Sequence, residues 1–126
     1  NALAVAVARE ALARFRDEDV LGQVASRGPL LRQGLEAIAK DRPYLGNVRG
    51  CGMVAAVDIR DPQGNPLDWK RRTGFAVYRQ AMSRGALLRN LGDSMYLFPP
   101  LVMDEAEIAR MLAILQDSLD AVMGRG

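Results

Sequence analysis

The amino-acid sequence predicts an α+β domain in which helices cover one face of a small, mostly antiparallel sheet. The chain has 126 residues, of which 49% are hydrophobic and 25% charged, as in a single globular domain. Apolar residues recur at helical spacing near both ends of the chain and alternate as in a strand between them. The resulting order of helices, strand pair, helix, strand pair and helix suits one layer of helices on an antiparallel sheet.

Two helices are predicted in the N-terminal part of the chain. Between Leu3 and Phe15 the apolar residues form one stripe along a helix. The acidic run 17–19 supplies an N-cap for a second helix, whose apolar positions continue to Ile38. Pro29 lies inside this second pattern, and proline removes a backbone donor and crowds the preceding turn. We therefore expect a kink or a short break there.

The first strand pair is predicted before an exposed loop. Residues 53–59 alternate between the two faces of a half-buried strand, and residues 48–49 lead into it. The glycines in segment 50–52 give the backbone freedom for a tight turn or a bulge. Segment 61–66 is dense in turn-forming residues, so we expect it to be an exposed loop.

A helix, a hairpin and a last helix complete the predicted domain. The third helix has its apolar stripe over 75–82 and ends at Gly85, a residue that adopts the left-handed conformation without strain. Two short strands, 86–90 and 94–98, are separated by a glycine-containing turn. The last helix covers 104–124, with an acidic start and a single apolar stripe.

The composition excludes several functional classes. The chain has no histidine, so it cannot build a Ser/His/Asp or Cys/His nucleophile system or a histidine-ligated metal site. Its two lysines, Lys40 and Lys70, lie among charged residues, which argues against Schiff-base chemistry on this chain. A net charge of +2 with scattered basic residues argues against a nucleic-acid partner. No apolar run approaches the roughly 20 residues needed to cross a bilayer, so no membrane partner is expected.

The single cysteine and the N-terminus indicate the cellular compartment and whether the chain is part of a larger protein. Cys51 has no second cysteine to pair with, and the N-terminus lacks a signal-peptide pattern, so we expect a cytoplasmic protein. Lying between two glycines, Cys51 is interpreted as a small buried residue rather than a reactive thiol. The chain starts at Asn1 rather than at methionine and is helical from the start, which predicts a fragment of a larger protein.

Asp58 and Asp61 form a candidate carboxylate pair that we discount. Both are predicted to lie at the end of a strand, next to a turn. Aspartate in such a place usually caps the turn or faces water. We therefore expect no acid–base pair there.

Arg89 is the candidate ligand-binding residue. It lies among apolar strand residues at the rim of the predicted hairpin. A guanidinium group in such surroundings binds a carboxylate through two parallel hydrogen bonds. The alternative is that Arg89 reaches into solvent or pairs with Asp93. Tyr96, on the opposing strand, would either lay its ring against the ligand or fill the core.

Three strings of residues, in order along the chain, are similar to parts of one enzyme family. They are Asn-Ala-Leu-Ala at 1–4, Val-Arg-Gly-Cys-Gly-Met at 48–53 and Gly-Ala-Leu-Leu-Arg-Asn-Leu-Gly-Asp-Ser-Met-Tyr-Leu-Phe-Pro-Pro at 85–100. Together they resemble the C-terminal part of the class III pyridoxal-phosphate-dependent aminotransferases. The resemblance implies that 1–126 is the C-terminal small domain of a larger fold-type I transferase, with 1–17 as a helix that connects it to the large domain.

The resemblance also implies where the chemistry lies. The pyridoxal 5'-phosphate and its Schiff-base lysine would belong to the large domain, so this chain would have no catalytic or cofactor-binding residue and would be inactive alone. Arg89 would bind the carboxylate of an oxo-acid acceptor, and Tyr96 would line the same pocket. Family members also build their active sites across a homodimer.

The signature around Arg89 narrows the resemblance. An arginine after two apolar residues, followed by Tyr-x-x-Pro-Pro, is similar to the biotin-biosynthesis branch, which transfers an amino group from S-adenosylmethionine to 8-amino-7-oxononanoate. That branch has proline directly after the arginine, where this chain has Asn90. Two alternatives stay open: another class III ω-amino-acid aminotransferase, and a non-catalytic α+β module that binds a protein partner.

Overall fold

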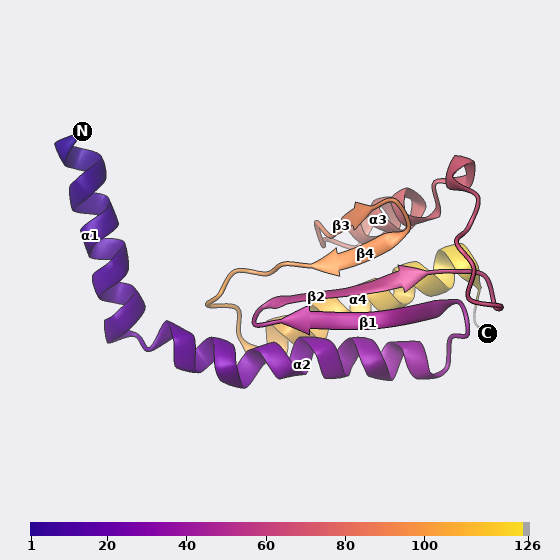
Figure 1. Ribbon diagram of the computed structural model, residues 1–126, viewed down its shortest axis with the longest axis horizontal. Helices are drawn as coiled ribbons and strands as arrows, with labels where there is room; N and C mark the ends of the chain where they lie inside the picture. Colours follow the sequence, from indigo (N-terminus) through magenta and orange to yellow (C-terminus); the bar gives the residue numbers. More distant parts are fainter. Residues whose placement is uncertain (125–126) are drawn as a thin grey trace.

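The computed structural model describes residues 1–124 and confirms the predicted α+β class (Figure 1). Four α-helices, four strands and one short 3-10 helix follow one another along this range. In chain order they are α1 (Ala2–Asp17), α2 (Val20–Lys40), β1 (Leu45–Cys51), β2 (Val54–Ile59), η1 (Trp69–Arg71), α3 (Thr73–Ser83), β3 (Arg89–Leu91), β4 (Ser94–Leu97) and α4 (Glu105–Met123).

The strands form one antiparallel sheet in the order β1-β2-β4-β3. Each outer strand pairs with the strand next to it in sequence, and β2 pairs with β4 at the centre of the sheet. Helices α2, α3 and α4 pack on one face (Figure 1). Within the described residues the opposite face carries no helix, and we call it the helix-free face.

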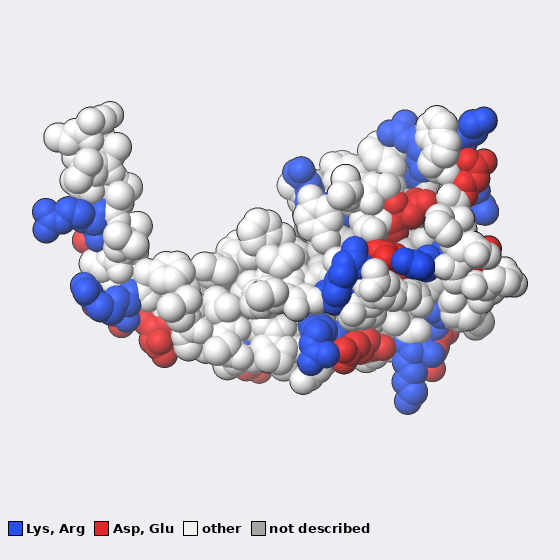
Figure 2. Space-filling view, viewed as in Figure 1, with Lys and Arg blue, Asp and Glu red and all other residues white. Residues whose placement is uncertain are grey.

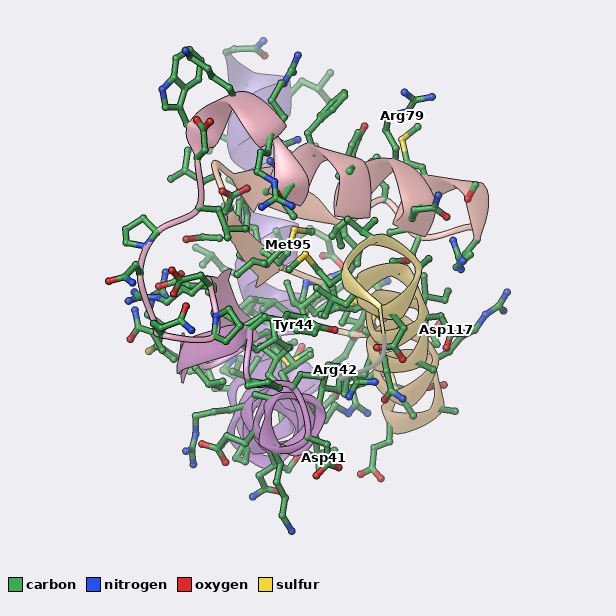
Figure 3. All side chains as sticks on the ribbon, turned by 90° about the vertical axis from the view of Figure 1, so that its right-hand side faces the viewer. Asp41, Arg42, Tyr44, Arg79, Met95 and Asp117 are labelled. Carbon is green, nitrogen blue, oxygen red and sulfur yellow. The ribbon has the colours of Figure 1, made fainter. Side chains whose placement is uncertain are left out.

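The hydrophobic core lies between the sheet and these three helices. Every second residue of β2 points into it, and Val57 is fully buried, as the alternation predicted. Met95 and Leu97 do the same from β4, and Figure 3 shows Met95 among the helices. The helices contribute Leu31, Leu35, Ile38, Val77, Ala81, Ile108, Leu115 and Leu119.

A nearly buried ion pair joins the C-terminal end of α2 to α4. Arg42 donates from Nε to Oδ1 of Asp120 at 2.8 Å and from Nη2 to Oδ2 at 2.7 Å. The two side chains are only 11% and 10% exposed. The hydrogen bond to Asp120 raises the pKa of Arg42, while burial raises the pKa of Tyr44, whose hydroxyl donates to the same carboxylate at 3.5 Å. Figure 3 shows Arg42 and Tyr44 beside α4.

Helix α2 runs through Pro29, so of the expected kink or short break the break is wrong, and the kink stays a prediction. At Gly28, next to Pro29, the helix backbone packs tightly against the β1–β2 hairpin. The contact leaves no room for a side chain, because a Cβ atom at Gly28 would lie 2.5 Å from the carbonyl oxygen of Gly52. The buried Leu31 and Leu35 hold the following turns in the core. This packing outweighs the hydrogen bond that Pro29 cannot donate.

The strand boundaries differ from the prediction in three places. β1 starts at Leu45, earlier than the predicted 48, and its register shifts between Gly46 and Arg49, where Asn47 has a φ of 53°. The turn predicted at 50–52 lies at 52–53 instead, with a φ of 52° at Gly52, because Gly50 and Cys51 are paired within the sheet. β3 starts at Arg89 and ends at Leu91, so it starts three residues later than the predicted strand 86–90 and ends one residue later.

The buried side of α3 contains Val77 and Ala81 of the predicted stripe, and it also includes Thr73 and Gly74 at the start of the helix. Phe75 and Met82, also assigned to the apolar stripe, are 37% and 48% exposed. A Cβ atom at Gly74 would lie within 2.2 Å of the Gly92 carbonyl oxygen. The absence of a side chain at Gly74 therefore lets α3 start directly against the β3–β4 turn.

Helix α1 confirms the first predicted helix but stands away from the sheet (Figure 1). The Asn1 side chain caps it by accepting hydrogen bonds from the amides of Leu3 and Ala4. None of its residues is buried. Throughout residues 1–124, no helix is both long and apolar enough to span a bilayer.

Candidate substrate-binding site

Arg89 and Tyr96 are direct cross-strand neighbours, as the predicted hairpin required. Arg89 is the first residue of β3, and Tyr96 lies opposite it in β4. Tyr96 is also opposite Ala56 of β2, and Ala56 is opposite Arg49 of β1. Because directly paired residues share a face, these four residues form one row across the helix-free face.

A cavity of about 730 Å³ opens beside the Arg89–Tyr96 pair. Its walls are segments 85–89 and 96–100, together with Met103 and one face of α4. The apolar residues Leu87, Leu88, Phe98, Met111 and Ile114 provide much of this lining. A volume of this size, with mostly apolar walls and a few polar groups, is typical of small-molecule sites.

The polar groups of the cavity include two residues that the sequence analysis missed. Glu107 and Arg110 reach it from α4. They share one helical face with Met111 and Ile114, because residues three, four or seven positions apart lie on the same side of a helix. That spacing was visible in the sequence, but only the tertiary structure brings this face to the hairpin.

Within the described residues, the Arg89 guanidinium group has no hydrogen bond or ion pair, and its side chain is exposed. The alternative partner, Asp93, is engaged elsewhere: its Oδ1 accepts a hydrogen bond of 2.8 Å from the amide of Gly74. The expected alternative of an Arg89–Asp93 pair is therefore wrong. The other alternative, that Arg89 reaches into solvent, agrees with its exposure.

Tyr96 does not fill the core. Its neighbours Met95 and Leu97 point into the core, whereas Tyr96 is half-buried on the helix-free face. Along residues 1–124 its hydroxyl group has no hydrogen-bonding partner. Tyr96 also lines the cavity beside Arg89.

Asp58 is a hydrogen-bonding centre on the helix-free face, which corrects the expectation that it caps a turn or faces water. Its carboxylate accepts hydrogen bonds from Ser94 Oγ (2.6 Å), Asn47 Nδ2 (2.9 Å), Arg49 Nη1 (2.9 Å) and Arg60 Nη2 (3.0 Å). Burial opposes the ionisation of this group, but the four donors, Ser94 first, outweigh it. They hold the pKa of Asp58 well below its usual range.

Asp61 caps the following loop, as expected. Its Oδ1 accepts hydrogen bonds from the amides of Gln63 (2.9 Å) and Asn65 (2.8 Å), and Oδ2 accepts one from Asn65 Nδ2. The hydrogen bonds from Asn65 lower the pKa of Asp61. Asp58 and Asp61 each have their own set of donors, so they do not form an acid–base pair.

Cys51 is exposed, so its interpretation as a buried residue is wrong. It is the last residue of β1, an outer strand of the sheet, and it pairs with Val54 across the hairpin turn. An outer strand next to a turn has no neighbour that could cover the side chain.

The two lysines of the chain lie away from the cavity beside Arg89. Lys40 is the last residue of α2 and Lys70 lies in η1, and neither lines the cavity. Nor do residues 1–124 contain a group of three or more histidine, cysteine, aspartate or glutamate residues that could hold a metal ion.

Comparison with known proteins identifies the family. Residues 1–119 match the family model described as aminotransferase class-III. The chain is 36% identical over 98% of its length to adenosylmethionine-8-amino-7-oxononanoate aminotransferase of Geobacter sulfurreducens, and 30% identical over 94% to putrescine–pyruvate aminotransferase of Pseudomonas aeruginosa. It covers 28% and 26% of these two relatives, so it spans about a quarter of their length.

Solved structures agree with the sequence comparison. An ω-aminotransferase from Paracoccus denitrificans superimposes with a TM-score of 0.87 and 30% identity, over 93% of this chain and 26% of that one. The PMP-bound form of an aminotransferase from Vibrio fluvialis gives a TM-score of 0.86 and 28% identity, over 93% of this chain and 26% of the other. Enzymes of class III depend on pyridoxal phosphate. The chain belongs to the class III aminotransferase family.

Proposed function

We propose that residues 1–126 are the C-terminal small domain of a cytoplasmic, homodimeric class III aminotransferase, and that this domain binds the substrate carboxylate. The single observation that carries the proposal is the exposed, unpaired Arg89 beside Tyr96 at a mostly apolar cavity. Residues 1–17 would connect this domain to the large domain. The large domain would hold pyridoxal phosphate, which supplies the electron sink for amino-group transfer.

In this proposal the chain's own residues bind and orient the substrate. The Arg89 guanidinium group donates two parallel hydrogen bonds to the carboxylate of the oxo acid. Tyr96 contacts the substrate next to that carboxylate, and the apolar walls of the cavity cover a hydrocarbon chain. When Arg89 holds the substrate carboxylate, the length of the substrate's hydrocarbon chain sets where its carbonyl group lies relative to the cofactor.

Transfer of an amino group from S-adenosylmethionine to 8-amino-7-oxononanoate is the proposed reaction. The 36% identity to the Geobacter sulfurreducens enzyme supports it. Asn90 replaces the proline of that branch, and its side chain donates to the Gly92 carbonyl oxygen at 2.9 Å. Asn90 thus stabilises the β3–β4 turn, which is compatible with the same placement of Arg89.

An ω-amino-acid aminotransferase is the second candidate. A probable γ-aminobutyrate transaminase of Oryza sativa is 29% identical over 95% of the chain, which is close to the value for the first candidate. Turnover of 8-amino-7-oxononanoate and of 4-aminobutyrate by the full-length enzyme separates the two. The first proposal predicts amino transfer to the oxononanoate, and exclusive use of 4-aminobutyrate would overturn it.

The experiment for the site is Arg89→Ala in the full-length enzyme. Loss of a charge-assisted, two-point contact should raise the KM for the oxo acid by about 10- to 100-fold. Arg79→Ala is the matched control, because Arg79 is an exposed arginine of α3 that does not line the cavity and points away from the core in Figure 3. An unchanged KM in Arg89→Ala would refute the carboxylate role.

A further inference from the structure

The Asp58 cluster ties three strands together on the helix-free face. Its donors come from β1 (Asn47 and Arg49), from Arg60 directly after β2 and from β4 (Ser94). The Asp58 side chain is 13% exposed, whereas those of Arg49 and Arg60 are 47% and 36% exposed. On the face shown in Figure 2, acidic and basic side chains alternate over the sheet. The carboxylate is therefore the fixed centre, and the longer side chains close around it.

One of these hydrogen bonds reaches the strand that carries the binding site. Ser94 lies opposite Asp58 and is two residues before Tyr96, so both side chains of β4 are on the same face. The bond from Ser94 Oγ to Asp58 Oδ1 is 2.6 Å long. The backbone adds a second link nearby, from the Ile59 amide to the Asp93 carbonyl oxygen at 2.8 Å. The start of β4 is thus held firmly to β2.

The position of Arg89 depends on this attachment. β3 is an outer strand of only three residues, and within the sheet it pairs with β4 alone. Any tilt or slide of β4 is therefore passed to Arg89 through its pairing with Tyr96. Short outer strands have few hydrogen bonds of their own to resist such a movement.

We propose that Asp58 is a positioning residue for substrate binding: through Ser94 it fixes β4, and β4 fixes the Tyr96–Arg89 pair toward the carboxylate. The inference rests on the proposed function, because it assumes that Arg89 binds a carboxylate. Asp58 itself does not line the cavity beside Arg89 and touches no substrate. Asp58 acts by fixing the position of Arg89. A displacement of the Arg89 guanidinium group by about 1 Å is enough to weaken its two hydrogen bonds to a carboxylate.

The test measures the affinity of the full-length protein for two probes by calorimetry. Octanoate carries a carboxylate, and octan-1-ol has the same chain without the charge. Ser94→Ala removes only the link to β4 and leaves Asp58 paired with Arg49 and Arg60. It should weaken octanoate binding by about 10-fold and leave octan-1-ol binding unchanged. Ser94→Thr keeps a hydroxyl donor and should restore the affinity for octanoate to within about twofold.

Two further variants complete the design. Asp61→Asn is the matched control, since Asp61 lies three residues after Asp58 but bonds only within its own loop, and it should bind octanoate as the parent protein does. Asp58→Ala should weaken octanoate binding at least as much as Ser94→Ala does. If Asp58→Ala fails to fold, the comparison of Ser94→Ala with Ser94→Thr still tests whether Asp58 positions β4.

The outcomes separate this inference from the proposed function. Weak octanoate binding in Arg89→Ala together with normal binding in Ser94→Ala would overturn the role of Asp58 and leave the proposed function intact. Unchanged octanoate binding in Arg89→Ala would overturn both. An equal loss of octanoate and octan-1-ol binding in Ser94→Ala would indicate general loosening of the fold and would also contradict the positioning role.

Discussion

Arg42 and Arg89 are the same residue type in two opposite situations. Arg42 is 11% exposed and makes a two-point ion pair with Asp120 between the ends of α2 and α4. Arg89 is exposed on an outer strand and has no partner among residues 1–124. The difference indicates that the Arg42 guanidinium group stabilises the fold, whereas that of Arg89 does not.

Physical chemistry explains why the chain tolerates both arrangements. An arginine that loses its partner inside the protein leaves an uncompensated charge, which is strongly unfavourable. An arginine at the surface stays hydrated, so lacking a partner costs little there. Arg89 can therefore remain unpaired only because it lies at the edge of the sheet beside an open cavity.

The largest expected loss of stability follows from removing the Arg42 guanidinium group. Arg42→Ala should lower the free energy of unfolding of the chain by about 3 kcal/mol, because it leaves Asp120 buried without its main partner. Urea denaturation followed by circular dichroism measures this change. A loss below about 1 kcal/mol, the usual value of a surface pair, would mean that the ion pair is not important to stability.

The Asp58 cluster is an intermediate case, because its arginines are paired but partly exposed. The pKa of Asp58 is lower in the folded state than in the unfolded state. The ionised carboxylate therefore contributes fully to the free energy of unfolding above the unfolded pKa of about 3.9, and this contribution is lost as the pH falls below that value. Between pH 7 and pH 3 the parent chain should lose about 1 kcal/mol more stability than Asp58→Asn.

Denaturant unfolding of both proteins at the two pH values measures that difference. Asp61→Asn serves as the control for general acid effects, since Asp61 is a loop carboxylate with a lowered pKa of its own. Identical pH profiles for the parent chain and Asp58→Asn would contradict the assignment of Asp58 as the centre of the cluster.

The smallest expected loss of stability follows from removing the Arg89 guanidinium group. Arg89→Ala should change the free energy of unfolding by less than about 0.5 kcal/mol, as is usual for an exposed residue without partners. The same denaturation experiment as for Arg42→Ala measures it. A loss similar to that of Arg42→Ala would place Arg89 among the residues that hold the fold together.

Much of the fold follows from local patterns in the sequence. The alternation in 53–59 and the stripe of α4 are period signals. The core-facing residues of 53–59 are buried, and the α4 stripe is buried at Ile108, Leu115 and Leu119 and partly buried at its other positions. The helix through Pro29 could not be predicted, because contact with the β1–β2 hairpin decides it. The exposure of Cys51 likewise depends on β1 being an outer strand.

The candidate site was likewise predictable only in part. The Arg89–Tyr96 pairing follows from a hairpin, which is local in sequence. The walls from α4 and the Asp58 cluster were missed, because they join residues far apart in the chain. The bond between Ser94 and Asp58, for example, depends on which strands are neighbours and in which register.

The most direct test of the account observes both guanidinium groups during one titration. In the full-length enzyme, the Nε–Hε signals of Arg42 and Arg89 are followed by NMR as 8-amino-7-oxononanoate is added. We expect the Arg89 signal to shift in a saturable way, as a new carboxylate accepts its hydrogen bonds, and the Arg42 signal to stay in place. An Arg89 signal that does not move at saturating oxo acid would contradict the account.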